Sequence, residues 1–286
     1  MIYGNLLAKV VRPKIRAGLI GSGTYGISLL AQSLCTARLD ISVVCDQDLE
    51  TAQKACLLAG FPEENILICS NTKEILLAME NGRCAVVEKY ELLMDVPLDV
   101  VVECTGNPEA GARHAELAIK NGKHVAMVNK EADSVVGPIL NRLADKAGVI
   151  YTPVDGDQHG LIMGFVSWAA CLGLEVVCVG KARPYDFVYD DNSGKVTNGQ
   201  ETVTLSKVEK KTLDKLQPGE AGHVIEERRN LLLKLPQIAE ADLCESVIAA
   251  NATGLLPDTP SMHAPIVRIT EIADVLSPKD GGGILE

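Results

Sequence analysis

The chain has 286 residues, of which 47% are hydrophobic, enough for one large or two ordinary globular domains without disulfide or metal staples. Its net charge of −11 would repel a nucleic-acid backbone, so we expect a small-molecule partner and no nucleic acid. The nine cysteines show no C-x-x-C and no zinc-type pairing with His, which predicts buried free thiols in a reducing cytoplasm and no metal.

Neither the N-terminus nor the most hydrophobic stretch has the pattern of a signal peptide or a membrane-spanning helix. The first residues lack the basic patch and apolar core of a signal peptide, so a cytoplasmic location is predicted. Residues 161–180 are apolar, but Glu175 interrupts them and Gly173 divides them, which favours a buried helix feeding a buried strand.

Residues 15–156 alternate short β-branched apolar runs with longer segments of helical period. This pattern is typical of right-handed βαβ units and predicts a Rossmann-like, doubly wound parallel α/β sheet. We expect a dinucleotide-binding domain over residues 1–156. A second α+β domain for substrate binding and dimerisation is expected over 157–286, and its C-terminal segment is a candidate to pack back on the first. The predicted strands of the first domain are residues 16–20, 41–45, 66–69, 100–104, 125–128 and 149–152.

The first apolar run opens into Gly21, Gly23 and Gly26 at G-x-G-x-x-G spacing, the pattern of a dinucleotide-binding turn. A helix should begin near Thr24, with its free N–H groups facing the pyrophosphate and Tyr25 in its first turn. A glycine-rich turn of another α/β domain is the alternative. The strand predicted before the turn and the helix predicted after it favour the interpretation as a coenzyme-binding turn.

Asp46 follows the second predicted strand and lies 20 positions beyond Gly26, where the adenosine ribose of a dinucleotide finds its carboxylate acceptor. A carboxylate there would accept hydrogen bonds from both ribose hydroxyls and repel a 2′-phosphate. No arginine follows at Gln47. We therefore predict NAD or NADP as the cofactor, with NAD favoured.

Polar residues follow the next strand at the same edge of the predicted sheet. Thr105, Gly106 and Asn107 are predicted to line the nicotinamide-ribose site, although a plain helix-entry turn before Pro108 is an equal alternative. A nucleophilic Cys104 is disfavoured, because it lies in a strand pattern and reactive thiols need an exposed electropositive setting.

The two following strands end in the same way. Asn129 is predicted to contact the cofactor, and Lys130 is a candidate proton donor to a carbonyl oxygen that receives hydride, with a solvated lysine as the alternative. Glu131 beside it is predicted to bind substrate. Asp157 and Gln158 have the same placement and are predicted to serve catalysis and substrate binding, respectively.

The second half predicts a helix over residues 161–172, a strand over 176–179, a loop-rich polar stretch over 183–222, and two later helices, the second over 240–250. Lys181 follows the predicted strand and is expected to meet the substrate from the opposite wall. Glu245 and Asn251 are predicted to fix substrate hydroxyls. Arg228 is a candidate for a substrate carboxylate or phosphate, with an exposed helix face as the favoured alternative.

Several of these motifs resemble a known family. Residues 100–108 and 122–133 resemble homoserine dehydrogenase-like oxidoreductases. Motifs in the second half resemble the branch that usually carries a C-terminal SAF domain and includes the 1-deoxy-D-xylulose 5-phosphate reductoisomerase-like proteins. These motifs are residues 156–158, 180–181, 227–230, 250–255, 257–258 and 262–263.

The resemblance implies an NAD(P)-dependent oxidoreductase acting on CH–OH groups. Lys130 corresponds to the crevice lysine of homoserine dehydrogenases, and Lys181 to the Gly-Lys motif of the branch. The chain departs from the branch at His159, where Pro is usual, at Ala264, where Gly is usual, and at Ala241, where Lys is common. A different substrate pocket is therefore expected. The chain stops about where a linker to the SAF domain would begin, which predicts a shortened member or a fragment.

Together these observations predict hydride transfer between nicotinamide and a hydroxyl or carbonyl carbon of a small polar metabolite, in a homodimer or higher homo-oligomer. Lys181 and Lys130 are the residues expected to polarise or protonate the oxygen. Two alternatives stay open. One is a reductoisomerase of a ketose phosphate, which needs a basic pocket around Arg228 and Arg229, and the other is a nicotinamide-sensing protein without turnover.

Overall fold

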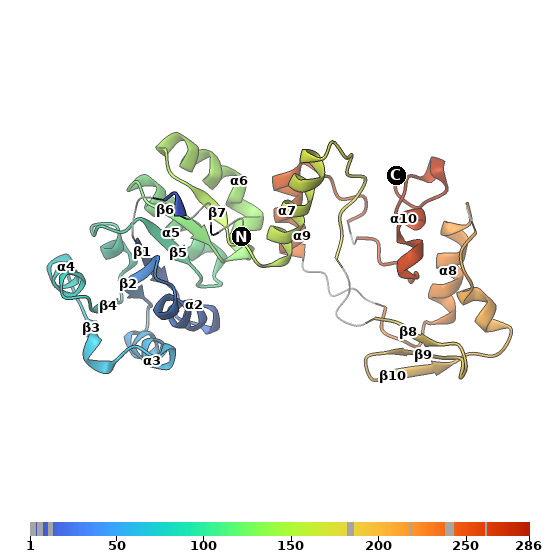
Figure 1. Ribbon diagram of the computed structural model, residues 1–286, viewed down its shortest axis with the longest axis horizontal. Helices are drawn as coiled ribbons and strands as arrows, with labels where there is room; N and C mark the ends of the chain where they lie inside the picture. Colours follow the sequence, from blue (N-terminus) through green and yellow to red (C-terminus); the bar gives the residue numbers. More distant parts are fainter. Residues whose placement is uncertain are drawn as a thin grey trace. The chain divides into compact units, whose positions relative to one another are not determined.

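The computed structural model describes residues 4, 8–10, 14–181, 186–217, 219–237, 243–260 and 262–286. The chain divides into two compact units, residues 1–157 and 158–286, which are described separately (Figure 1).

A seven-stranded parallel sheet forms the centre of the first unit, with the strand order β3-β4-β2-β1-β5-β6-β7. Strands β2 to β4 lie on one side of β1, and β5 to β7 lie on the other. The order reverses between β1 and β5, where open α/β sheets form their ligand crevice. This confirms the predicted Rossmann-like α/β fold. The strands are β1 (Ile15–Ile20), β2 (Leu39–Cys45), β3 (Ile66–Ile68), β4 (Cys84–Val87), β5 (Val100–Glu103), β6 (His124–Met127) and β7 (Tyr151–Pro153).

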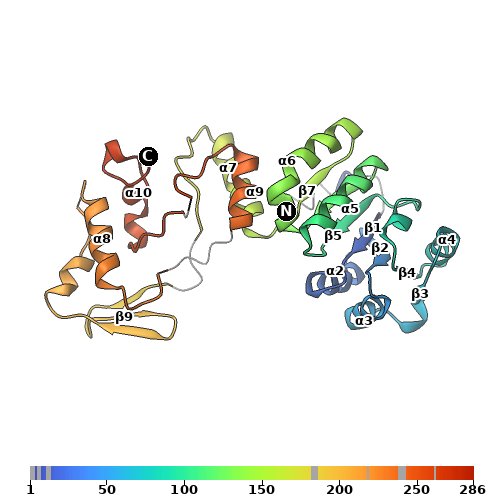
Figure 2. The same cartoon turned by 180° about the vertical axis from the view of Figure 1, so that it is seen from behind.

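Helices cover both faces of this sheet. Val43 and Val44 are neighbours in β2 and are fully buried in two different apolar clusters, because successive strand side chains point to opposite faces. One cluster includes residues of α4 (Thr72–Glu80), α5 (Pro108–Lys120) and α6 (Lys130–Ala147). The other cluster includes residues of α2 (Thr24–Cys35) and α3 (Leu49–Ala59). These two helices lie side by side in both views (Figure 1, Figure 2).

The local signals in the sequence determine where these helices start and stop. Asp48 caps α3 by accepting a hydrogen bond from the backbone N–H of Glu50 at 3.1 Å. Pro108 occupies the first turn of α5, and Gly122 follows that helix with a φ of +69°. Strand β4 was not predicted, because a four-residue apolar run shows no periodicity that separates strand from helix.

The second unit contains a three-stranded antiparallel sheet, β10-β9-β8, made of β8 (Val188–Asp190), β9 (Lys195–Asn198) and β10 (Glu201–Thr204). It lies inside the stretch predicted to be loop-rich. The missed signal is Asn198-Gly199 between two runs of alternating Val and Thr, which is typical of a tight hairpin. The predicted strand over residues 176–179 is wrong, since these residues belong to no strand.

The described residues of the second unit also form four α-helices: α7 (Gln158–Cys171), α8 (Ala221–Leu231), α9 (Leu243–Thr253) and α10 (Ile272–Val275). Helix α7 was predicted to be buried, but His159 is its one buried residue. An exposed apolar stripe is instead formed by Leu161, Phe165 and Trp168 of this helix and by Leu172, which directly follows its last residue. The first residues of the helix predicted over 240–250, with Ala241, lie outside the described residues.

All nine cysteines are free thiols, but Cys35, Cys171 and Cys178 are exposed, which corrects the expectation that the thiols are buried. In the described parts of the chain, every helix is too short or too polar to cross a membrane.

Candidate functional site

The turn between β1 and α2 contains three glycines with different constraints. Gly21 has a φ of +97°, and a Cβ there would lie 2.8 Å from backbone atoms of Cys104 and Thr105. A Cβ on Gly26 would lie 2.5 Å from the carbonyl oxygen of Gly21. The fold itself therefore requires glycine at both positions. A Cβ on Gly23 would meet nothing within 4 Å, so this glycine leaves open space beside the backbone, as close approach of a ligand requires.

The N-terminus of α2 is suited to an anion. Its first turn holds no acidic residue, Thr24 and Tyr25 are exposed, and within the described chain no side chain caps it. Free N–H groups and the positive end of the helix dipole make such a terminus a phosphate-binding site. The other α-helices of this unit, α3 to α6, are capped by the side chains of Asp48, Asn71, Asn107 and Asn129.

Asp46 lies directly beside this turn, after the end of β2. Its Oδ2 accepts hydrogen bonds from the backbone N–H of Ser22 at 2.9 Å and from the Ser22 hydroxyl at 2.5 Å. Its Oδ1 accepts from the backbone N–H of Asp48 at 3.2 Å. A carboxylate offers about four acceptor positions, so the fixed Asp46 side chain keeps capacity for a ribose hydroxyl.

The turn after β5 is held by a network of polar side chains. The Thr105 hydroxyl donates to Glu103 Oε1 at 2.6 Å, and Asn107 caps α5 by accepting from the N–H of Ala110 at 3.0 Å. Gly106 between them is exposed, with a φ of +69°. Because a Cβ on Gly21 would collide with the backbone of Thr105, the structure brings this turn against the glycine turn, as the strand order predicts.

Asn129 links the ends of β5 and β6. Its Nδ2 donates to the carbonyl of Asn107 at 2.8 Å, while its Oδ1 accepts from the N–H of Ala132 at 3.1 Å and caps α6. The side chain is 2% exposed. Both ends of its amide are therefore hydrogen-bonded within the protein. Asn129 holds the two turns together, and these contacts do not favour the predicted contact between its side chain and the cofactor.

Cys104 is a structural thiol. Its Sγ donates to the carbonyl oxygens of Gly21 at 2.9 Å and Ile20 at 3.3 Å. Burial, with smaller contributions from the negative charges of Glu103 and Asp46, raises the pKa of Cys104 to about 12. A neutral thiol is a poor nucleophile, which agrees with the prediction that Cys104 is not a nucleophile.

Lys130 and Glu131 form the first turn of α6 and are both partly exposed at the carboxyl end of β6. They therefore lie at the same edge of the sheet as Thr105. Asp157 and Gln158 fall where the two units meet in sequence. The remaining candidates lie in the second unit, with Glu245 buried in α9, Asn251 exposed in α9, and Lys181 partly exposed outside any helix or strand. Their roles in a site remain predictions.

Arg228 is a structural residue, contrary to its predicted contact with substrate. It lies in α8 and is 2% exposed. Its guanidinium donates two hydrogen bonds to Glu271, at 2.6 and 3.1 Å, and three to the carbonyl oxygens of Thr212, Asp214 and Ile266. These bonds use all five N–H groups of the side chain, so none is left for a carboxylate or phosphate of a substrate.

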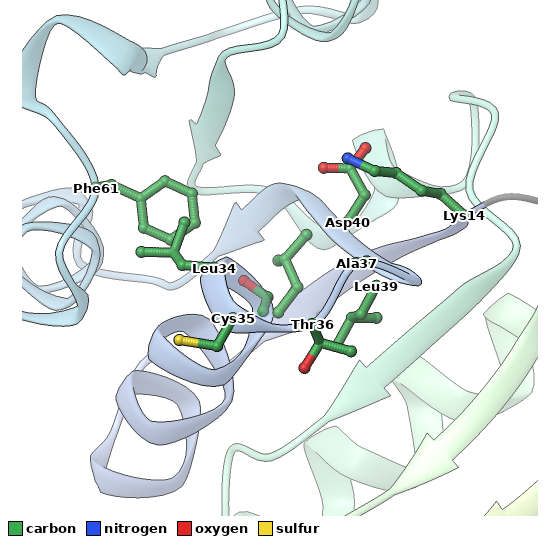
Figure 3. Close-up of a pocket in the computed structure, with 10 residues that line it drawn as sticks. Lys14, Leu34, Cys35, Thr36, Ala37, Leu39, Asp40 and Phe61 are labelled. Atoms are coloured by element: carbon green, nitrogen blue, oxygen red, sulfur yellow. The ribbon is translucent and has the colours of Figure 1, made fainter. Parts of the chain in front are cut away.

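A cavity of about 350 Å³ lies away from the glycine turn. Figure 3 shows Lys14 and Asp40 on one side of it, with Phe61 and Leu34 on another. Asp40 lies at the start of β2, whereas Asp46 follows its end, so this cavity is at the opposite edge of the sheet. It therefore contributes nothing to the candidate site. No group of three or more His, Cys, Asp or Glu in the described chain is placed to hold a metal ion.

A parallel sheet with a glycine turn after β1, an uncapped α2 and a fixed carboxylate after β2 defines a dinucleotide-binding domain of the Rossmann class. Residues 17–153 match the family described as homoserine dehydrogenase, NAD binding domain. Over these residues the first unit is therefore similar to the NAD-binding domain of homoserine dehydrogenases.

Two related proteins each match about half of the chain. A 1-deoxy-D-xylulose 5-phosphate reductoisomerase from Macrococcus caseolyticus is 27% identical over 151 residues, which is 50% of this chain and 39% of that protein. A homoserine dehydrogenase from Neisseria gonorrhoeae is 28% identical over 145 residues, which is 48% of this chain and 28% of that protein. Each match spans less than half of the relative's length. The similarity therefore does not establish either activity for this chain.

Solved structures match more weakly. The WlbA dehydrogenase from Bordetella pertussis, solved with NADH and UDP-GlcNAcA, is 20% identical with a TM-score of 0.41, over 56% of this chain and 41% of that one. A TM-score of this size supports no functional conclusion.

Proposed function

We propose that this protein is an NAD-dependent oxidoreductase that transfers hydride between the nicotinamide ring and a hydroxyl or carbonyl carbon of a small polar metabolite. The observation that carries the proposal is the Asp46 carboxylate, fixed by Ser22 beside the uncapped N-terminus of α2. This arrangement offers a ribose acceptor and a phosphate site together, within reach of one dinucleotide. The match of residues 17–153 to an NAD-binding family supports it.

The proposed preference is for NAD over NADP. A 2′-phosphate at the ribose would bring negative charge against the Asp46 carboxylate, which the Ser22 hydrogen bonds hold in place. In this proposal Gly21, Gly23 and Gly26 with Thr24 and Tyr25 receive the pyrophosphate, and the turn of Thr105, Gly106 and Asn107 receives the nicotinamide half.

The bound coenzyme would supply or accept the hydride, and the chain would handle the proton. We assign this task to Lys130, at the carboxyl end of β6, and Lys181, with Asp157 as a further acid–base candidate. A positioned proton donor contributes about a hundredfold to ten-thousandfold in rate. The proposed substrate contacts are Glu131, Gln158, Glu245 and Asn251.

The alternative of a ketose-phosphate reductoisomerase loses its main candidate for a phosphate site. That chemistry requires a basic pocket, and Arg228 was half of the basic pair predicted to supply it. Since its five N–H groups are used within the protein, only the exposed Arg229 remains of that pair. Hydride transfer without rearrangement is therefore favoured.

We also propose that the protein is a homo-oligomer whose copies pack through α7. This helix carries no charged residue, and each side chain of its stripe, Leu161, Phe165, Trp168 and Leu172, is more than half exposed. At about 200 Å² per large side chain, the stripe presents about 400 Å² per copy. Two copies would then bury about 800 Å² through the stripes alone, so neighbouring residues must complete a stable interface. Light scattering of the purified chain and of Trp168→Glu tests this, and a monomeric parent chain would refute it.

The activity is tested by titrating the purified protein with NADH and NADPH, then screening hydroxy acids, amino alcohols and ketose phosphates at 340 nm. We expect tighter binding of NADH and turnover of at least one substrate class. Lys130→Ala and Lys181→Ala should lower kcat by about a hundredfold or more while NADH still binds. Binding without turnover of any substrate would favour the nicotinamide-sensing alternative, and unchanged turnover in both variants would refute the roles of these lysines.

A further inference from the structure

Glu103 is a buried carboxylate at the centre of the sheet. It is the last residue of β5 and is 0% exposed. Its Oε1 contacts three groups: the Thr105 hydroxyl at 2.6 Å, the Thr105 backbone N–H at 3.3 Å, and His114 Nδ1 at 3.2 Å. Among the described residues, Oε2 has no hydrogen-bond partner. A carboxylate so deeply buried is costly, so its retention at a strand end calls for a local task.

The contacts of Thr105 indicate that task. Its hydroxyl donates to Glu103 and accepts from the backbone N–H of Asn107 at 3.3 Å, while Asn129 Nδ2 lies 3.5 Å away. The carboxylate thus anchors Thr105 at the start of the exposed turn formed by residues 105–107, and the Thr105 hydroxyl in turn holds Asn107 at its end. Gly106 at the tip has open space around it and would leave the turn conformationally free without this anchor.

His114 holds the carboxylate from the other side. It is 7% exposed in α5, and its ring lies 4.2 Å from the ring of Tyr90. Gly111, one turn earlier in the same helix, allows the close packing, since a Cβ there would lie 3.0 Å from Glu103 Oε2 and 2.6 Å from Asn129 Nδ2. Helix α5 therefore fixes the orientation of the carboxylate that in turn fixes the 105–107 turn.

We infer that Glu103 is a positioning residue that holds the 105–107 turn in the conformation that receives the nicotinamide half of the coenzyme. This inference rests on the proposed function. The adenosine half meets a different set of residues, because Asp46 is fixed by Ser22 and has no bond to Glu103 or Thr105 among the described contacts. The hydrogen bonds that orient Asp46 and those that orient Thr105 are therefore different, so the two halves of the site can be tested separately.

The test compares the affinity for NADH, which uses both halves, with the affinity for ADP, which uses the adenosine half alone. Glu103→Gln replaces the carboxyl group by an amide, whose oxygen is a weaker acceptor, and Thr105→Val removes the hydroxyl without changing Glu103 itself. Each variant should raise the Kd for NADH about tenfold and leave the Kd for ADP within about twofold. The double variant should bind NADH no more weakly than the weaker-binding single variant, because both changes act on the same hydrogen bond.

Two controls separate positioning from folding. Thr105→Ser restores the hydroxyl and should recover the NADH affinity that Thr105→Val loses, whereas Glu109→Gln removes an exposed carboxylate of α5 and should change neither affinity. If Glu103→Gln fails to fold, Thr105→Val decides the question. If Thr105→Val loses NADH and ADP affinity equally, or keeps its full NADH affinity, this inference is overturned while the proposed function stands. A parent protein that binds neither ligand would overturn the proposed function together with it.

Discussion

The carboxylate of Asp46 accepts two hydrogen bonds from Ser22, one from its backbone N–H and one from its hydroxyl. These residues are 24 positions apart, and the bonds join the end of β2 to the glycine turn after β1. The ribose acceptor is therefore oriented before any coenzyme arrives. Pre-oriented groups lose little entropy on binding, so this pair should matter for affinity as well as for the choice between NAD and NADP.

Replacement of Asp46 by Asn should change coenzyme preference. The amide cannot repel a 2′-phosphate and is a weaker acceptor, so we expect about tenfold weaker NADH binding and a smaller loss for NADPH. Fluorescence titration with both coenzymes measures the ratio. The matched control is Asp48→Asn, because Asp48 caps α3 and its side chain makes no bond to the glycine turn among the described contacts. An unchanged NADH to NADPH ratio in Asp46→Asn would contradict the proposed ribose contact.

Alanine substitutions at Gly23 and Gly21 should have different effects on stability and on NADH binding. Gly23 has a φ of −71° and open space around it, so Gly23→Ala should fold with a free energy of unfolding within about 1 kcal/mol of the parent and bind NADH at least tenfold more weakly. Gly21→Ala should instead destabilise the fold, because alanine there is strained at a φ of +97° and collides with the backbone of Cys104. Urea unfolding with parallel NADH titration distinguishes the two. Full NADH affinity in a folded Gly23→Ala protein would argue against a dinucleotide at this turn.

The first unit was largely predictable because its signals are local. The glycine spacing, the Asp48 cap and the Pro108 entry are each decided within a few residues, and all three appear as expected. Arg228 shows the opposite case. Its partner Glu271 lies 43 positions away, and no local pattern reveals that the two meet in a buried pair. The sequence alone therefore left an exposed helix face or a substrate contact as the available interpretations.

Glu103 was overlooked for a related reason. The apolar pattern of β5 gives no sign that its last residue is fully buried. A usable signal did exist, since a charged residue that directly ends a β-branched run at the switch point of a parallel sheet lies where ligands bind. Its contact with His114, however, depends on how α5 packs, which the spacing of 11 residues does not specify.

Cys104 should resist alkylation in the folded protein. Burial raises the pKa of its thiol to about 12, so the reactive thiolate is scarce at pH 8. The exposed Cys35 and Cys171 should react with iodoacetamide first. Mass spectrometry of peptides after a short treatment, native against urea-unfolded, measures the order. Labelling of native Cys104 as fast as Cys35 would show that the site around it is open and would revive its candidacy as a nucleophile.

The Arg228–Glu271 pair should make the second unit sensitive to acid. Burial by itself would raise the pKa of Glu271, but hydrogen bonds from Arg228 and from the backbone N–H groups of Arg268 and Leu216 outweigh it and hold the pKa at about 2. In the unfolded chain the same group titrates near 4.5. Its contribution to stability is thus complete above about pH 4.5 and is lost as the pH falls towards 2, because the unfolded state then binds the proton first.

A shift of this size corresponds to about 3 kcal/mol at neutral pH. Glu271→Gln should therefore lower the free energy of unfolding by about 3 kcal/mol at pH 7 and by less at pH 3, so that the two unfolding curves converge as the pH falls. Urea unfolding at pH 3, 5 and 7 measures the difference. Glu109→Gln is the control, because its ion pair with Arg113 is exposed and should cost less than about 1 kcal/mol at every pH. A constant difference between parent and Glu271→Gln across this range would mean that the pair stabilises the unit without ionisation of Glu271, as a neutral hydrogen-bonded contact would.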